Sequence, residues 1–119
     1  MKRIGFTQRV DHVPGYEEYR ESLDRRWIEF SETCRFFPIP LSNVTDNRDS
    51  YINGQCLDGI ILTGGNDLAK YGGRNNSIVR DSFESFLIDY AAQYAVPIIG
   101  VCRGMQMLNV HKGGGLARV

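Results

Sequence analysis

Apolar and polar positions recur along the chain with two periods, which distinguishes strands from helices. The segment Lys2 to Thr7 predicts a strand, because Ile4 and Phe6 fall on one face of an extended chain. The clearest helical pattern spans Ser77 to Tyr94, where apolar residues recur every three or four positions and Ser77 is a suitable N-cap. The same spacing predicts a helix over 16–33.

Other apolar segments predict further strands, separated by loops and short helices. Pro38 and Pro40 restrict the strand over 35–41 to an edge position or a short length. The remaining expectations are strands over 57–62 and 96–101, short helices over 46–53 and 105–112, polar loops over 8–15 and 69–76, and the start of a strand over 116–119.

The alternation of strands and helices indicates the fold class. Because the strands over 57–62 and 96–101 are apolar on both faces, they predict an α/β fold with a partial doubly wound, flavodoxin-like parallel sheet and helices on both faces. No domain boundary is evident, so we expect a single unit over 1–119. The carboxyl ends of parallel strands share one edge of a sheet, and the loops after 2–7, 57–62 and 96–101 should meet there.

Composition narrows the class of partner. The chain has 119 residues, with 14 Lys and Arg, 14 Asp and Glu, and a net charge of zero, which argues against nucleic acid or a membrane surface as a partner. Cys34, Cys56 and Cys102 are too few and too widely spaced for a disulfide framework or a zinc site. The N-terminus lacks a signal-peptide pattern and no apolar run approaches about 18 residues. We therefore expect a cytoplasmic protein without metal or cofactor.

The segment most indicative of chemistry is Gly100-Val101-Cys102-Arg103-Gly104. A Gly-x-Cys-x-Gly between a strand and a helix is the cysteine form of the nucleophile elbow, a sharp and strained turn. A β-carbon at either glycine would collide with neighbouring backbone. The partial positive charge of the helix N-terminus favours a thiolate, so Cys102 is a candidate nucleophile. The alternative is a buried structural cysteine.

A second candidate feature is the turn Leu62-Thr63-Gly64-Gly65-Asn66-Asp67 at the end of a predicted strand. Peptide N–H groups of Gly64, Gly65 and Arg103 would suit an oxyanion hole for thiolate attack on a carbonyl, although paired glycines also occur in ordinary turns. Gln106, one helical turn beyond the elbow, is either an exposed helix residue or one that positions a substrate.

A nucleophilic cysteine needs a base, and the sequence offers only two imidazoles. His111 lies roughly 13 Å from Cys102 along a helix, which is too far. His12 follows the first strand at the correct edge, but a solvated loop histidine is the simpler interpretation. Asp81 and Glu84, in the first turns of the helix over 77–94, are expected only to complement the helix dipole.

Together these residues resemble the class I glutamine amidotransferase superfamily, and more closely its γ-glutamyl-γ-aminobutyrate hydrolase-like branch, the C26 peptidase family. The matching stretches are Leu62 to Asp67, Arg80-Asp81-Ser82-Phe83-Glu84, Pro97 to Val110 and Gly113-Gly114-Gly115-Leu116. The resemblance implies hydrolysis of a γ-glutamyl amide through a glutamyl thioester on Cys102. It also implies an oxyanion hole made by Gly64, Gly65 and Arg103, with Gln106 positioning the γ-glutamyl group.

The resemblance covers only the N-terminal half of a family domain. The family's catalytic histidine and its carboxylate partner belong to a later segment, so we expect a fragment, a disrupted gene product or half of a two-chain enzyme. The expected partners are a small γ-glutamyl substrate and, in the last case, a second chain. Two alternatives stay open: a non-catalytic binding or assembly module that retains the elbow, and a DJ-1/PfpI-like protein, in which a histidine is expected where Arg103 stands.

Overall fold

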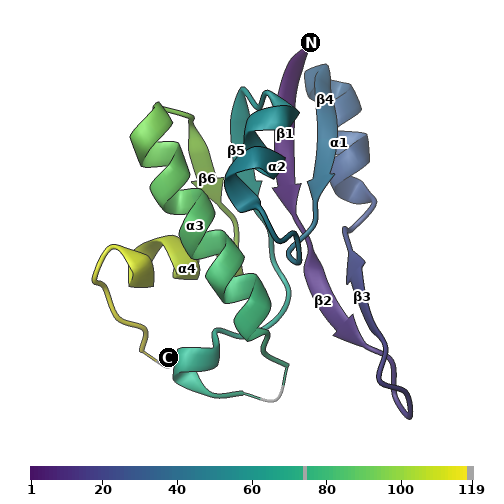
Figure 1. Ribbon diagram of the computed structural model, residues 1–119, viewed down its shortest axis with the longest axis vertical. Helices are drawn as coiled ribbons and strands as arrows, with labels where there is room; N and C mark the ends of the chain where they lie inside the picture. Colours follow the sequence, from purple (N-terminus) through teal and green to yellow (C-terminus); the bar gives the residue numbers. More distant parts are fainter. Residues whose placement is uncertain (74, 118–119) are drawn as a thin grey trace.

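The computed structural model describes residues 1–73 and 75–117 and has an α/β architecture (Figure 1). A parallel sheet with the strand order β4-β1-β5-β6 forms its centre. Its strands are β1 (Lys2–Thr7), β4 (Phe36–Leu41), β5 (Gly59–Leu62) and β6 (Ile98–Gly100). The predicted parallel α/β sheet is confirmed, and the proline-containing strand β4 lies at an edge, where its missing N–H groups need no ladder partner.

Helices pack on both faces of this sheet (Figure 1). One face carries α2 (Arg48–Gln55), α3 (Ile78–Tyr94) and α4 (Arg103–His111), and the other carries α1 (Arg26–Cys34). The larger core lies between the sheet and the first three of these helices, and its completely buried side chains include Leu41, Ile52, Leu62, Phe83 and Leu87.

The second core, on the α1 face, is smaller. It joins Ile4, Phe6 and Ile61 to Trp27 of α1. Ile99 of β6 is the register partner of Ile61, yet its side chain remains 60% exposed. The β6 end of this face is therefore less covered than the β4 end.

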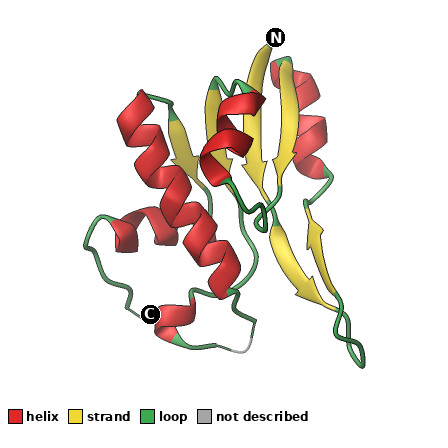
Figure 2. Ribbon diagram, viewed as in Figure 1, coloured by secondary structure: helices red, strands yellow, loops and turns green. Residues whose placement is uncertain are grey.

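A hairpin is the main departure from the sequence predictions. The strands β2 (Arg9–His12) and β3 (Tyr19–Ser22) pair antiparallel in a ribbon that projects beyond the sheet (Figure 2). The predicted polar loop over 8–15 and single helix over 16–33 are therefore wrong in this region. Gly15, with φ of 82°, lies in the turn that reverses the chain. Asp24 then accepts a hydrogen bond from the Arg26 peptide N–H at 2.9 Å, so α1 begins later than its apolar spacing suggested.

Other element boundaries differ by a few residues. The N-cap of α3 is Ser77, as predicted, and its hydroxyl accepts from the Arg80 peptide N–H at 3.2 Å. Helix α2 includes Gly54 and ends at Gln55, because Cys56 takes the left-handed conformation. A 3-10 turn, η1 (Ala69–Tyr71), lies within the expected loop over 69–76. In the segment predicted to begin a strand, residues 116–117 are not in a strand, and residues 118–119 lie outside the described ranges.

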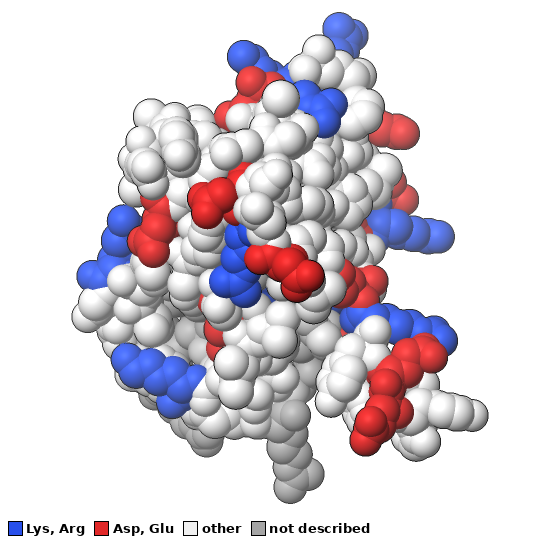
Figure 3. Space-filling view, in the orientation of Figure 1, with Lys and Arg blue, Asp and Glu red and all other residues white. Residues whose placement is uncertain are grey.

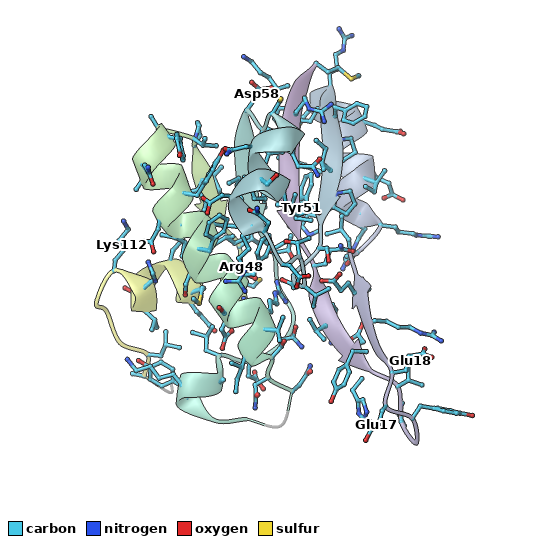
Figure 4. All side chains as sticks on the ribbon, in the orientation of Figure 1. Glu17, Glu18, Arg48, Tyr51, Asp58 and Lys112 are labelled. Atoms are coloured by element: carbon cyan, nitrogen blue, oxygen red, sulfur yellow. The ribbon has the colours of Figure 1, made fainter. Side chains whose placement is uncertain are left out.

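The surface carries mixed charge. Basic and acidic side chains are interspersed over the face shown in Figure 3, consistent with the zero net charge. Figure 4 places Glu17 and Glu18 at the far end of the hairpin, away from the sheet. Within the described ranges, no helix combines the length and apolar character needed to span a membrane.

The burial pattern of α3 generates a stability prediction. Leu87 is completely buried, whereas Ile78 on the same helix is 73% exposed. Leu87→Ala should lower the free energy of unfolding by about 2–5 kcal/mol, because it removes buried methyl groups and leaves a cavity. Ile78→Ala should change it by about 0.5 kcal/mol or less. Urea unfolding followed by circular dichroism measures both, and equal effects would contradict the described orientation of α3.

Candidate functional site

Cys102 occupies the turn between β6 and α4, at the carboxyl edge of the sheet. Its backbone angles are φ 54° and ψ −114°. Few residues with a side chain adopt this conformation, which costs on the order of 1–3 kcal/mol. The residue is exposed and is not part of a disulfide. It is therefore a strained, accessible cysteine at a strand-to-helix turn and not a buried structural one.

Two glycines allow this turn to pack tightly. A β-carbon at Gly100 would overlap the carbonyl group of Gly104, and a β-carbon at Gly104 would overlap the carbonyl group of Leu62. These are backbone atoms and cannot rotate away as a side chain can. The missing side chains therefore let α4 begin directly against the end of β5.

The Gly64-Gly65 turn lies beside Cys102. Leu62 pairs with Gly100 in the parallel ladder, and the Val101 peptide N–H donates to the Leu62 carbonyl at 2.9 Å. A β-carbon at Gly64 would lie 3.5 Å from Cβ of Cys102. The turn and the cysteine line one cavity of about 480 Å³. The structure thus brings together the two features that the sequence placed at one edge of the sheet.

Other walls of this cavity come from segments without an evident sequence motif. They belong to the hairpin and to the start of α1, and their residues are Arg9, Ser22, Asp24, Arg26, Trp27 and Phe30. The rings of Trp27 and Phe30 meet edge to face at 5.7 Å. A ligand that reaches Cys102 would therefore meet both aromatic and charged groups.

Asn66 ties the hairpin to the glycine turn. Its side-chain oxygen accepts from the Val10 peptide N–H, and its side-chain nitrogen donates to the Val10 carbonyl, both at 2.9 Å. This side chain thus imitates a neighbouring strand. Its φ of 61° lies in the left-handed region, which asparagine tolerates better than most residues. An asparagine directly after two glycines is the signal that the sequence offered for this turn.

The two histidines do not reach the cavity of Cys102. His12 lies on β2, with Nε2 2.7 Å from the carbonyl oxygen of Tyr16. His111 ends α4, with Nε2 2.9 Å from Oδ1 of Asp89. Neither belongs to the residues that line the cavity. The sequence interpretation of both as non-catalytic agrees with these positions.

Asp24 is the one carboxylate among the described residues that line the cavity. The side-chain hydrogen bonds from Arg26, and then the hydrogen bond from its peptide N–H, lower the pKa of Asp24 to about 2. A base works best with a pKa near the working pH, so Asp24 is a poor proton acceptor at neutral pH.

Gln106 lies apart from this cavity. It is an exposed residue of α4 and lines a separate hollow with Asp67, Leu68 and Tyr71. The Gln106 peptide N–H donates to the Cys102 carbonyl at 3.2 Å, but the two residues line different hollows. Its role in holding a γ-glutamyl group stays a prediction.

A buried ionic network corrects the expectation for Asp81 and Glu84. Arg80 and Glu84 are completely buried on α3, and Arg80 Nε donates to Glu84 Oε2 at 2.6 Å. The same oxygen accepts from Arg103 Nη1 at 2.8 Å, and Arg103 Nη2 pairs with Asp81. The two carboxylates therefore bind buried arginines and do more than complement the helix dipole. The available signal was spacing, since Arg80 and Glu84 lie in helical register with the buried Leu87.

Opposite formal charges balance within this network. Burial lowers the pKa of Arg80 from its ordinary value, and the charge of Glu84 opposes that shift. Two arginines and two carboxylates make a neutral group. Breaking a buried ion pair by removing one partner typically costs about 3–5 kcal/mol, because a charge is left uncompensated.

Comparison with known proteins identifies relatives over most of the chain. The family model described as Peptidase C26 matches residues 4–119. A protein of Campylobacter jejuni named gamma-glutamyl-CDP-amidate hydrolase is 37% identical over 108 residues, which cover 88% of this chain and 52% of that protein. A glutamine amidotransferase-like protein of Lactococcus lactis subsp. lactis is 41% identical over 105 residues, covering 82% of this chain and 42% of that protein. Its homologue in Lactococcus lactis subsp. cremoris is 35% identical to this chain over 105 residues, which cover 82% of this chain and 53% of that protein. The chain thus spans about half the length of these relatives.

The close approach of α4 to β5 can be tested with two glycines. Gly104→Ala should lower the free energy of unfolding by about 1–3 kcal/mol or more, because the new methyl group overlaps the Leu62 backbone. Gly54→Ala is the matched control, since a β-carbon there would meet no atom within 4 Å. At the penultimate position of α2, it should leave stability unchanged or raise it by up to about 0.5–1 kcal/mol. Urea unfolding gives both values, and a Gly104→Ala protein as stable as the control would refute the tight contact.

Proposed function

Because the chain belongs to the peptidase C26 family, we propose that it is the nucleophile-bearing part of a glutamine amidotransferase-like enzyme that hydrolyses a γ-glutamyl amide. The family match over residues 4–119 confirms the resemblance seen in the sequence. One observation carries the proposal: the strained, exposed Cys102 shares a cavity with the Gly64-Gly65 turn.

In the proposed reaction, the Cys102 thiolate attacks the γ-carbonyl carbon. A carbon–sulfur bond forms, and an electron pair moves to the carbonyl oxygen. The peptide N–H groups of Gly64, Gly65 and Arg103 would donate to this oxyanion. When the intermediate collapses, the carbon–nitrogen bond breaks and the amine leaves after taking up a proton. Water then hydrolyses the thioester, which releases glutamate and restores the thiol.

The hydrogen bonding of the peptide groups supports the proposed oxyanion hole. Among the described residues, the N–H groups of Gly64, Gly65 and Arg103 have no acceptor. Arg103 is the first residue of α4, where the leading N–H groups of a helix have no partner within the helix. Free donors close to a nucleophile are what a developing oxyanion requires.

The proton for the leaving amine needs another source. Within the described ranges, no histidine lines the cavity and the carboxylate of Asp24 is a poor base. We propose that the missing acid–base pair comes from the part of the family domain that follows these residues in its longer relatives. It would act either in the same polypeptide or as a second chain.

The walls of the cavity suggest the first substrate to test. The Campylobacter relative is named for a γ-glutamyl amide whose amine carries a cytidine diphosphate. A leaving group with an aromatic base and phosphates has chemistry compatible with the Trp27 and Phe30 rings and with Arg9 and Arg26. We therefore propose γ-glutamyl amides of nucleoside diphosphate amidates ahead of free glutamine.

We expect the 119-residue chain alone to release amine from γ-glutamyl amides very slowly. General acid–base help is typically worth about 10²–10⁴ in rate, and none of the described residues that line the cavity is placed to give it. Adding the C-terminal half of a C26 relative, fused or as a second chain, should restore turnover by a factor in this range. Release of CDP-amidate from γ-glutamyl-CDP-amidate, and of ammonia from glutamine, measures both states.

Cys102→Ala serves as the control and should abolish the restored turnover. Mass spectrometry of the quenched reaction should detect a glutamyl adduct on Cys102, which a non-catalytic binding module would not form. Robust Cys102-dependent turnover by the chain alone would show that a base lies within it. His12→Ala would then be the first variant to examine.

A further inference from the structure

The glycine turn is held from its buried side by one guanidinium. Arg80 Nη1 donates to the carbonyls of Gly64 at 3.1 Å and Gly65 at 2.5 Å, and Nη2 donates to the carbonyl of Thr63 at 2.8 Å. Arg80 is completely buried and lies outside the set of residues that line the cavity. Three consecutive peptide carbonyls therefore point toward α3.

Because peptide groups are planar, the contact between Arg80 and the turn carbonyls also fixes where the peptide N–H groups of the turn point. In a trans peptide, the C=O of one residue and the N–H of the next point in opposite directions. With the Thr63 and Gly64 carbonyls directed at Arg80, the N–H groups of Gly64 and Gly65 must point away from it. Because the turn lines the cavity shared with Cys102 and the buried Arg80 does not, these N–H groups would face the cavity.

One carboxylate links this turn to the start of α4. Oε2 of Glu84 accepts from Arg80 Nε at 2.6 Å and from Arg103 Nη1 at 2.8 Å. Arg80 fixes the Gly64-Gly65 donors, and the backbone of Arg103 supplies the donor next to Cys102. Glu84 therefore joins the two halves of the proposed oxyanion hole through buried charge-assisted hydrogen bonds, which are the stronger class of hydrogen bond.

We infer, on the basis of the proposed function, that Arg80 and Glu84 are positioning residues of the oxyanion hole. Neither touches the substrate. Arg80 directs the N–H groups of the glycine turn into the cavity, and Glu84 keeps Arg80 and Arg103 in register with each other. A purely structural network would instead hold α3 against α4 without affecting the chemistry of a carbonyl at Cys102.

Two reactions of Cys102 distinguish a positioning role from a purely structural role of Arg80 and Glu84. Neither reaction needs a general acid for its leaving group. A γ-glutamyl 4-nitrothiophenyl thioester acylates the thiolate through an oxyanion: a new carbon–sulfur bond forms, and 4-nitrothiophenolate leaves without a proton. Iodoacetamide alkylates the same sulfur by displacing iodide, and no oxyanion forms. The ratio of the two rate constants therefore reports the oxyanion hole, while alkylation alone reports access to the thiolate.

Glu84→Gln should lower the ratio of acylation to alkylation by about 10–100-fold, somewhat less than the 10²–10³-fold loss on deleting an oxyanion donor outright. Arg80→Lys should lower it similarly, because a compact ammonium lacks the planar fork with which the guanidinium reaches the three carbonyls from two nitrogens. The matched controls are Glu32→Gln and Arg25→Lys, which alter exposed side chains and should leave the ratio unchanged. Circular dichroism establishes whether each variant is folded.

The outcomes distinguish the inference from the function on which it rests. If the wild-type chain is acylated no faster than free glutathione, or if Cys102→Ala is acylated equally, the proposed function fails. If the wild type is acylated and folded Glu84→Gln and Arg80→Lys keep its ratio, the positioning inference fails alone. Variants that lose both reactions together with their helical signal would show a structural role, and this too would overturn the inference.

Discussion

The guanidinium of Arg80 meets three consecutive peptide carbonyls between α3 and the end of β5. Where the strand ends, the turn loses the partners of the sheet ladder, yet buried carbonyls still need donors. A guanidinium presents five N–H groups in one plane and can serve several acceptors at once. The turn can therefore stay close-packed beside Cys102, and the shape of the cavity depends on this contact.

The need for a charged group at this point explains the rest of the network. Buried ion pairs can often be replaced by apolar side chains without loss of stability. An apolar side chain in place of Arg80 would leave the turn carbonyls unsatisfied, at about 1–3 kcal/mol for each buried group. Once a cation is required, a carboxylate must accompany it, and Glu84 also reaches Arg103. The network is thus a consequence of how the turn is built.

Sequence patterns predicted the strand bounds and helix caps that depend on nearby residues, and the features that follow directly from a parallel sheet. Strand β1 was predicted residue for residue, Ser77 caps α3 as expected, and the parallel topology placed Gly64 near Cys102. The hairpin was missed because the spacing of Tyr19 fits a helix as well as a strand, and its partner in β2 decides between them. The buried network was missed for a similar reason, since charged helix residues usually face water and the second arginine lies far along the chain.

In the proposed reaction, the described residues can supply the attack on the carbonyl but not the proton transfer to the leaving group. The proposed nucleophile, the Cys102 thiol, and the proposed oxyanion donors, which are peptide N–H groups, lie in the turns where β5, β6 and α4 meet, so their placement depends on how these elements pack. Proton transfer needs a further side chain, because Asp24, the one carboxylate among the described residues at the cavity wall, is paired with Arg26. Attack on a carbonyl with a good leaving group requires only the first set, whereas release of an amine requires both. The two steps should therefore respond separately to changes in this part of the domain.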